Sequence, residues 1–158
     1  MGEPHSIAIW LPLAVSAGAV AATIAIHTLA VIATVNFVRH EQRLGRVGAG
    51  FWPDLSIVGV TISVAFAAHL VEIGVWAALF MLCGEFQAFA MAYDHSAVNY
   101  TTLGYGNVIM TPSWRLLGPL EAATGMLMFG VSTAIVFAVI QRLILSRFAD
   151  LRMKLKGK

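Results

Sequence analysis

The longest stretch of the chain without a charged residue constrains the fold most. Between Glu3 and Arg39 lie 35 residues with no Asp, Glu, Lys or Arg. As an α-helix rising ~1.5 Å per residue, this stretch exceeds the ~30 Å hydrocarbon core of a bilayer. The predicted first membrane span runs from about Ile7 to Val38. A secretory signal needs a basic start and a short apolar core, so we expect this segment to stay in the mature protein.

Composition extends this conclusion to the rest of the chain. Of the 158 residues, 59% are hydrophobic and 11% are charged, whereas soluble domains average about 45–50% and about 25%. Two further spans are predicted, from Leu55 to Cys83, interrupted by His69 and Glu72, and over the 20 residues from Ala122 to Gln141. The single cysteine, Cys83, excludes an intrachain disulfide. The sequence therefore predicts an all-α membrane protein with three transmembrane helices.

Basic residues predict the orientation. Nine of the ten lie in the connector Arg39 to Asp54 and in the tail from Arg142, and Arg115 is the tenth. The positive-inside rule places both segments in the cytoplasm, with the N-terminus outside a cell (inner) membrane. Asp54 is the expected N-cap of the second span. Beside a membrane helix, a basic tail favours membrane lipid as a partner over nucleic acid.

The segment between the second and third spans differs from an ordinary loop. An apolar half-helix over about Gln87 to Tyr100 precedes Thr102-Leu103-Gly104-Tyr105-Gly106. Irregular backbone at membrane depth requires surrounding protein or water, so the pattern predicts a re-entrant pore helix and loop. We expect positive φ at Gly104 and Gly106, which would align successive carbonyls. Such carbonyls can replace the hydration shell of a monovalent cation.

At these five residues the chain resembles the potassium channel pore-domain family, whose signature is Thr-Val/Ile-Gly-Tyr-Gly. Leu103 replaces the usual Val or Ile. The resemblance covers about Leu55 to Leu145, and the extra N-terminal helix looks most like that of small bacterial ion channels. It implies a homotetramer with K+ in a shared filter, no enzymatic activity and no other cofactor. The expected parts are an N-terminal helix and loop (1–53), a pore domain (54–146) and a basic tail (147–158).

The resemblance also implies roles for individual residues. Thr102 would add a hydroxyl at the inner mouth of the filter, and Tyr105 would point away from the ions. A glycine turn closing an extracellular hairpin is the alternative, but the position directly after a half-helix and between two spans favours a selectivity filter. The expected filter support is Val98, Thr101 and Asn107.

Three positions depart from the family pattern. Asn107 replaces the usual acidic residue, Asp94-His95 replaces an aromatic pair, and Val98 stands where some members have a buried acid. These departures leave open how strictly the filter would select potassium over sodium.

Ionisable residues within the spans have two interpretations. His69 and Glu72 share a helical face and would form a proton-sensing gate, or half of a metal site with His27. Alternatively they hydrogen-bond each other or a neighbouring helix and hold the first span against the pore. We favour the second interpretation and expect no transition-metal site, because so few ligands define no coordination sphere. In the third span, Gly125 and Gly130 are candidate gating hinges, or positions of close packing.

Taken together, these features predict a potassium-selective channel that conducts passively. The alternatives are a weakly selective cation channel, or a non-conducting structural or regulatory subunit with the same fold. An intramembrane metalloenzyme built on His27, His69 and Glu72 is the least favoured hypothesis.

Overall fold

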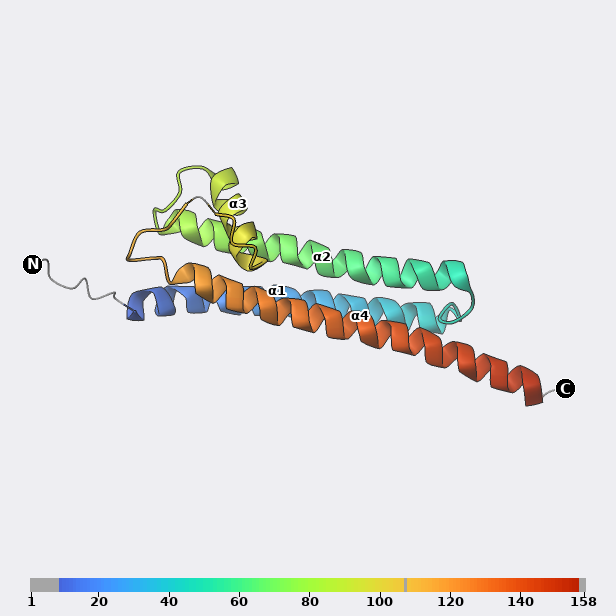
Figure 1. The fold of residues 1–158 in the computed structure, drawn as a ribbon. Coiled ribbons are helices and arrows are strands. Elements are labelled where there is room, and N and C mark those ends of the chain that lie inside the picture. Colours follow the sequence, from blue (N-terminus) through green and yellow to red (C-terminus); the bar gives the residue numbers. More distant parts are fainter. Residues whose placement is uncertain (1–8, 107, 157–158) are drawn as a thin grey trace, which may run out of the picture. The chain divides into compact units, whose positions relative to one another are not determined.

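The computed structural model describes residues 9–106 and 108–156 and contains four helices in that part of the chain (Figure 1). They are α1 (Trp10–Arg43), α2 (Phe51–Leu82), α3 (Phe89–Tyr100) and α4 (Leu117–Lys156). Three segments are long and apolar enough to cross a membrane: Trp10–Arg43, Phe51–Leu82 and Leu117–Ala149. The all-α membrane fold with three spans and one short helix is therefore confirmed.

The boundaries of the first connection differ from the prediction. Helix α1 continues to Arg43 and α2 already begins at Phe51, so the connection is residues 44–50. Asp54 lies in the first turn of α2 and is not its N-cap, which corrects that prediction. Its carboxylate instead accepts the backbone N–H of Gly48 (2.9 Å) and pairs with Arg147 (2.8 Å). Asp54 thus connects α2 to the turn that precedes it and to α4.

Two long helices end in the same glycine turn. At the end of α1, the N–H groups of Gly45 and Arg46 donate to Gln42 and Glu41, and Gly45 has φ 68°. At the end of α2, Gly84 has φ 77°, and Gly84 and Glu85 donate to Met81 and Phe80. This pair of bonds is the Schellman motif, which requires left-handed backbone at the residue after the cap.

The helices contribute to two compact units. The pore-helix unit comprises Met1–Ile26 and His69–Phe129, and the basic unit comprises His27–Ala68 and Gly130–Lys158. The core of the pore-helix unit includes Trp76, Phe80, Ala92, Tyr100 and Leu117, whereas that of the basic unit is Ile57, Val139 and Leu143.

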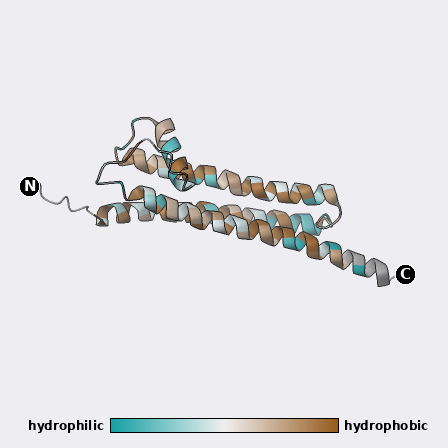
Figure 2. Ribbon diagram, in the orientation of Figure 1, coloured by the Kyte–Doolittle hydropathy of each residue, from teal (hydrophilic) through white to brown (hydrophobic). Residues whose placement is uncertain are grey.

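Hydrophobic residues recur along α2 and α4 (Figure 2), and many of the large apolar residues of the long helices are exposed. Leu29, Phe66 and Leu127 are 67%, 62% and 68% exposed. Such surfaces are stable in lipid, where no water has to be ordered around them.

Candidate ion-conduction site

Helix α3 packs against the core of the pore-helix unit by one face. Its buried residues are Ala92, His95, Ser96 and Tyr100, a spacing of three and four residues that places all of them on one side. Ala88 precedes the helix in an extended conformation. The Thr102–Gly106 segment follows directly after Thr101, the C-cap of α3.

A Schellman motif also ends α3, but with threonine in the glycine position. The N–H of Thr102 donates to the Asn99 carbonyl (2.9 Å), and the N–H of Leu103 donates to Val98 (3.0 Å). Thr102 has φ 60°, and among the described residues it is the only one other than glycine with a positive φ. A β-branched residue in this region is strained, so the start of the segment stores conformational energy.

The glycines of the segment behave differently from each other. Gly104 has φ 74°, as predicted, but Gly106 does not have a positive φ, and the prediction for Gly106 was wrong. Left-handed backbone instead occurs at Thr102 and Gly104, two residues earlier, because the turn that ends α3 already demands it at Thr102. Positive φ therefore alternates with ordinary φ over Thr102 to Tyr105.

The predicted support residues act in distinct ways. The Val98 carbonyl accepts the N–H groups of both Leu103 (3.0 Å) and Gly104 (3.4 Å), so Val98 holds the segment through its backbone. The Thr101 hydroxyl donates to the Ala97 carbonyl (2.7 Å), within its own helix. A Cβ placed on Gly106 would lie 3.8 Å from the His95 ring and 4.0 Å from the Val98 side chain. Asn107 lies outside the described residues.

A buried polar cluster ties the end of α3 to α2. The Tyr100 hydroxyl donates to the Glu72 carboxylate and lies 3.0 Å from Nδ1 of His69. His69 and Glu72 also approach each other, at 3.4 Å. Phe129 of α4 stacks on His69 with a ring separation of 4.4 Å. The pair predicted inside the membrane therefore contacts the last residue of the pore helix.

Two further contacts involve carboxylates of the same unit. The Ser96 hydroxyl lies 2.8 Å from the Ile73 carbonyl and 2.5 Å from the Glu121 carboxylate, and Glu121 is fully buried. Beyond the Thr102–Gly106 segment, Thr111 donates its backbone N–H (2.9 Å) and its hydroxyl (2.5 Å) to Glu85. The Ser96 hydroxyl therefore links α3 to the buried Glu121 carboxylate of α4.

His95 occupies an aromatic environment beside Gly106. Its ring lies 5.5 Å from that of Phe80 and 5.0 Å from that of Phe86. Burial lowers the pKa of His95, against the smaller opposing effects of Asp94 and Glu85, and so favours the neutral ring. In the described part of the chain neither ring nitrogen has a hydrogen-bond partner. His95 thus fills the place of an aromatic side chain.

Comparison with known proteins agrees with this geometry. A family model described as an ion channel matches residues 68–142, from the middle of α2 to the basic end of α4. This region belongs to the ion-channel family. Searches of curated proteins and of solved structures gave no match. The protein is an ion channel and a multi-pass membrane protein.

The two candidate hinges of the ion channel have different surroundings. A Cβ on Gly125 would lie 2.2 Å from the Tyr100 carbonyl oxygen, so α4 meets the end of α3 where Gly125 has no side chain. A Cβ on Gly130 would have nothing within 4 Å. Close packing is thus the observed role of Gly125.

In the basic unit, His27 shares a hydrogen bond with Ser132 (3.1 Å).

Three residues hold α3 through contacts that sequence reasoning did not identify. Ser96 and Tyr100 are spaced four apart on the buried face of α3, and Glu121 lies opposite Ser96 on α4. Polar residues recurring every four positions in an apolar half-helix were the available signal. Their partners, however, come from helices distant in sequence.

Proposed function

We propose that the protein is a homotetrameric, potassium-selective channel whose filter is Thr102-Leu103-Gly104-Tyr105-Gly106. The observation that carries this proposal is the alternation of backbone handedness, with φ 60° at Thr102 and φ 74° at Gly104, directly after the pore helix α3. Such alternation turns successive carbonyl oxygens to one side. Carbonyl oxygens in a row replace the water around a dehydrating K+ ion.

The surroundings of the filter support conduction of cations. Helix α3 ends at Tyr100, so the partial negative charge of its C-terminus lies at the filter entrance and favours a cation there. The filter is exposed within a single chain, with Leu103 57% and Tyr105 81% accessible. Four chains around one axis would cover these side chains and complete a ring of carbonyls. The ligand is K+, and no covalent chemistry or organic cofactor is required.

The basic residues support an orientation for the channel. Nine of ten lie in the segments that begin at Arg39 and Arg142. With these segments in the cytoplasm, the N-terminus and the residues from Glu85 to Glu121 face the outside of a cell (inner) membrane. The filter would then open toward the exterior, and the basic ends of α1 and α4 would contact the cytoplasmic leaflet.

Flux through reconstituted liposomes tests the proposal. Purified protein should carry a potassium-driven flux that barium blocks and that exceeds sodium flux under the same gradient. Gly104→Ala should abolish the selective flux, whereas Gly59→Ala, a change at a helical glycine with open space around it, should not. Equal fluxes of sodium and potassium would leave only a weakly selective cation channel. A folded tetramer without flux would identify a non-conducting subunit.

A further inference from the structure

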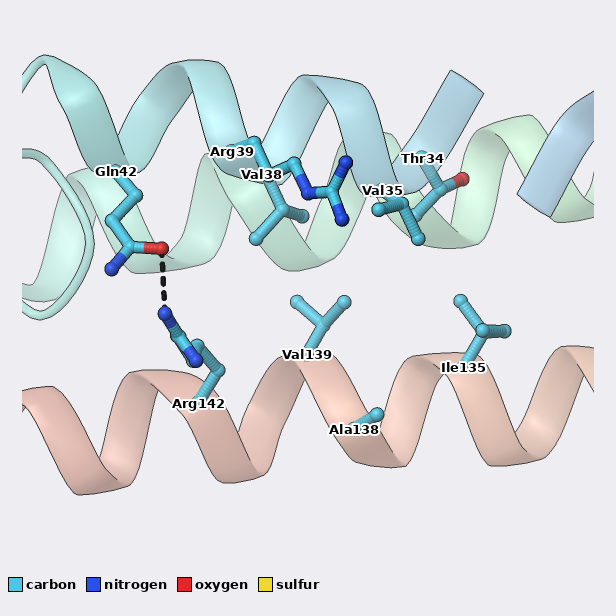
Figure 3. A pocket seen from close by; sticks show the side chains of 9 residues that line it. All are labelled: Thr34, Val35, Val38, Arg39, Gln42, Ile135, Ala138, Val139 and Arg142. Carbon is cyan, nitrogen blue, oxygen red and sulfur yellow. Dashed lines mark hydrogen bonds between the residues drawn. The ribbon is translucent and has the colours of Figure 1, made fainter. Parts of the chain in front are cut away.

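The basic unit contains a cavity between α1 and α4, and none of its lining residues belongs to the proposed filter. It measures about 220 Å³ and is lined by Thr34, Val35, Val38, Arg39, Gln42, Ile135, Ala138, Val139 and Arg142. Figure 3 shows Val35 and Val38 of α1 facing Ile135 and Val139 of α4. The wall is therefore apolar along most of its length, with two arginines at the cavity.

The two arginines of this cavity differ in their ion pairing from Arg46 and Arg147, two other arginines of the basic unit. Arg46 pairs with Glu41 and Arg147 pairs with Asp54, whereas in the described part of the chain neither Arg39 nor Arg142 lies in an ion pair. The guanidinium of Arg142 donates to the Gln42 side-chain oxygen (2.8 Å; Figure 3). This bond orients Arg142 without neutralising its charge. Among the residues that the structure describes, no acidic side chain lines the cavity.

From this combination we infer that the cavity binds a membrane phospholipid with an anionic headgroup. The phosphate would contact Arg39 and Arg142, because guanidinium groups bind phosphate oxygens in pairs of hydrogen bonds. One acyl chain would lie against Val35, Val38 and Ile135. Basic pockets between membrane helices bind lipid headgroups in this way. A free anion would leave the apolar wall uncovered, so charge and hydropathy together select a lipid.

Native mass spectrometry of the full protein tests the site without measuring ion flux, so its outcome is independent of the channel proposal. The probes are phosphatidylglycerol and phosphatidylcholine with identical acyl chains. Phosphatidylglycerol should bind at least about tenfold more tightly, because phosphatidylcholine would bring its cationic choline group close to the two arginines. Equal affinity for the two lipids would overturn the inference.

Matched variants locate the binding. Arg39→Gln with Arg142→Gln should remove the preference for phosphatidylglycerol, whereas Arg43→Gln with Arg152→Gln, which removes the same charge outside the cavity, should keep it. If the first double variant fails to fold, Arg39→Gln alone serves, because Arg39 has no ion pair among the described residues to lose. Equal loss in both double variants would indicate general attraction to charge and refute a defined site.

A substitution in the apolar wall separates a lipid from other occupants. Ala138→Phe should fill the cavity and weaken phosphatidylglycerol binding with both arginines intact, whereas Ala134→Phe, one turn away and outside the lining, should not. If inorganic phosphate competes and Ala138→Phe leaves binding unchanged, the cavity binds a simple anion and the lipid proposal is wrong. Loss of the oligomer in Ala138→Phe, with lipid binding retained, would make the cavity a contact between chains.

Discussion

In the pore-helix unit, Trp76, Phe80 and Tyr100 are completely buried, whereas the apolar cluster of the basic unit consists of Ile57, Val139 and Leu143. Polar contacts are likewise more deeply buried in the pore-helix unit than in the basic unit. Buried hydroxyl groups of α3 contact Glu72 and Glu121 in the first unit, while the ion pairs Arg46–Glu41 and Arg147–Asp54 of the second are partly exposed.

The difference follows from the kind of backbone that each unit contains. Regular helices satisfy their own N–H and C=O groups, so the basic unit needs only modest packing to keep its helices together. The pore-helix unit contains the irregular segment Thr102 to Gly106, whose conformation is strained at Thr102. A strained backbone persists only where its surroundings determine it, which explains the many contacts around α3.

The largest expected difference is between the glycines of α4 that belong to the two units. Gly125→Ala would force a Cβ to within 2.2 Å of the Tyr100 carbonyl oxygen and should cost about 3 kcal/mol of stability. Gly130→Ala has open space and should be neutral or gain up to about 1 kcal/mol from helix propensity. Thermal unfolding in detergent measures both. Similar stabilities of the two variants would show that α4 does not depend on close contact at Gly125.

Removing a hydroxyl from α3 should also reveal the dense contacts of the pore-helix unit. Tyr100→Phe removes a donor from the buried Glu72 carboxylate and should lower stability by about 1–3 kcal/mol. Tyr93→Phe is the matched control, because its hydroxyl donates to the Leu70 carbonyl at an exposed position. Equal unfolding temperatures of the two variants would contradict a structural role for the Tyr100 cluster.

The two glycines of the proposed filter provide the next comparison, within one segment. Gly104→Ala places a side chain at φ 74° and should cost about 1–2 kcal/mol locally, with loss of potassium selectivity. Gly106→Ala meets only ordinary contacts at 3.8 Å, so its effect should be smaller. The ratio of potassium to sodium flux in liposomes is the measurement. A larger effect of Gly106→Ala would mean that the alternation does not begin at Thr102.

Relief of strain at Thr102 should stabilise the protein. Left-handed backbone costs a residue with a side chain ~1–2 kcal/mol. Glycine avoids this cost but loses ~0.5–1 kcal/mol of conformational entropy on folding, so Thr102→Gly should stabilise the protein by up to about 1 kcal/mol. Thr101→Gly is the control and should destabilise, because Thr101 has φ −81° in the helical region. Unfolding temperatures compare the two variants. Destabilisation by Thr102→Gly would show that the hydroxyl matters more than the strain.

The smallest effect is expected in the basic unit. Asp54→Asn removes the ion pair with Arg147, whose side chain is 48% exposed, but keeps an oxygen for the Gly48 N–H. The loss should be about 0.5–1 kcal/mol, and it should shrink at high salt because exposed charges are screened. Denaturation at low and high salt measures it. A loss as large as that of Tyr100→Phe would remove the contrast between the units.

The amino-acid sequence by itself determined the three spans, the short helix before Thr102 and the positive φ of Gly104. Each follows from a local property, such as a run without charges or a residue that lacks Cβ. The extent of the helices was less predictable. Helix α1 reaches Arg43, where the turn at Gly45 ends it, and α2 starts at Phe51. Asp54 of α2 accepts from Gly48 and binds Arg147, a residue of α4, which no local pattern indicates.

Only the tertiary structure decided which groups hold α3 and the Thr102–Gly106 segment that follows it. Hydropathy indicates that a polar residue within a membrane span is energetically costly. It does not predict which residue of another helix forms a hydrogen bond with that polar group. Tyr100 with Glu72, and Ser96 with Glu121, are separated by 28 and 25 positions in the sequence. The left-handed residue at Thr102 was equally hidden, because threonine disfavours that conformation and adopts it here where the bonds to Val98 and Asn99 end α3.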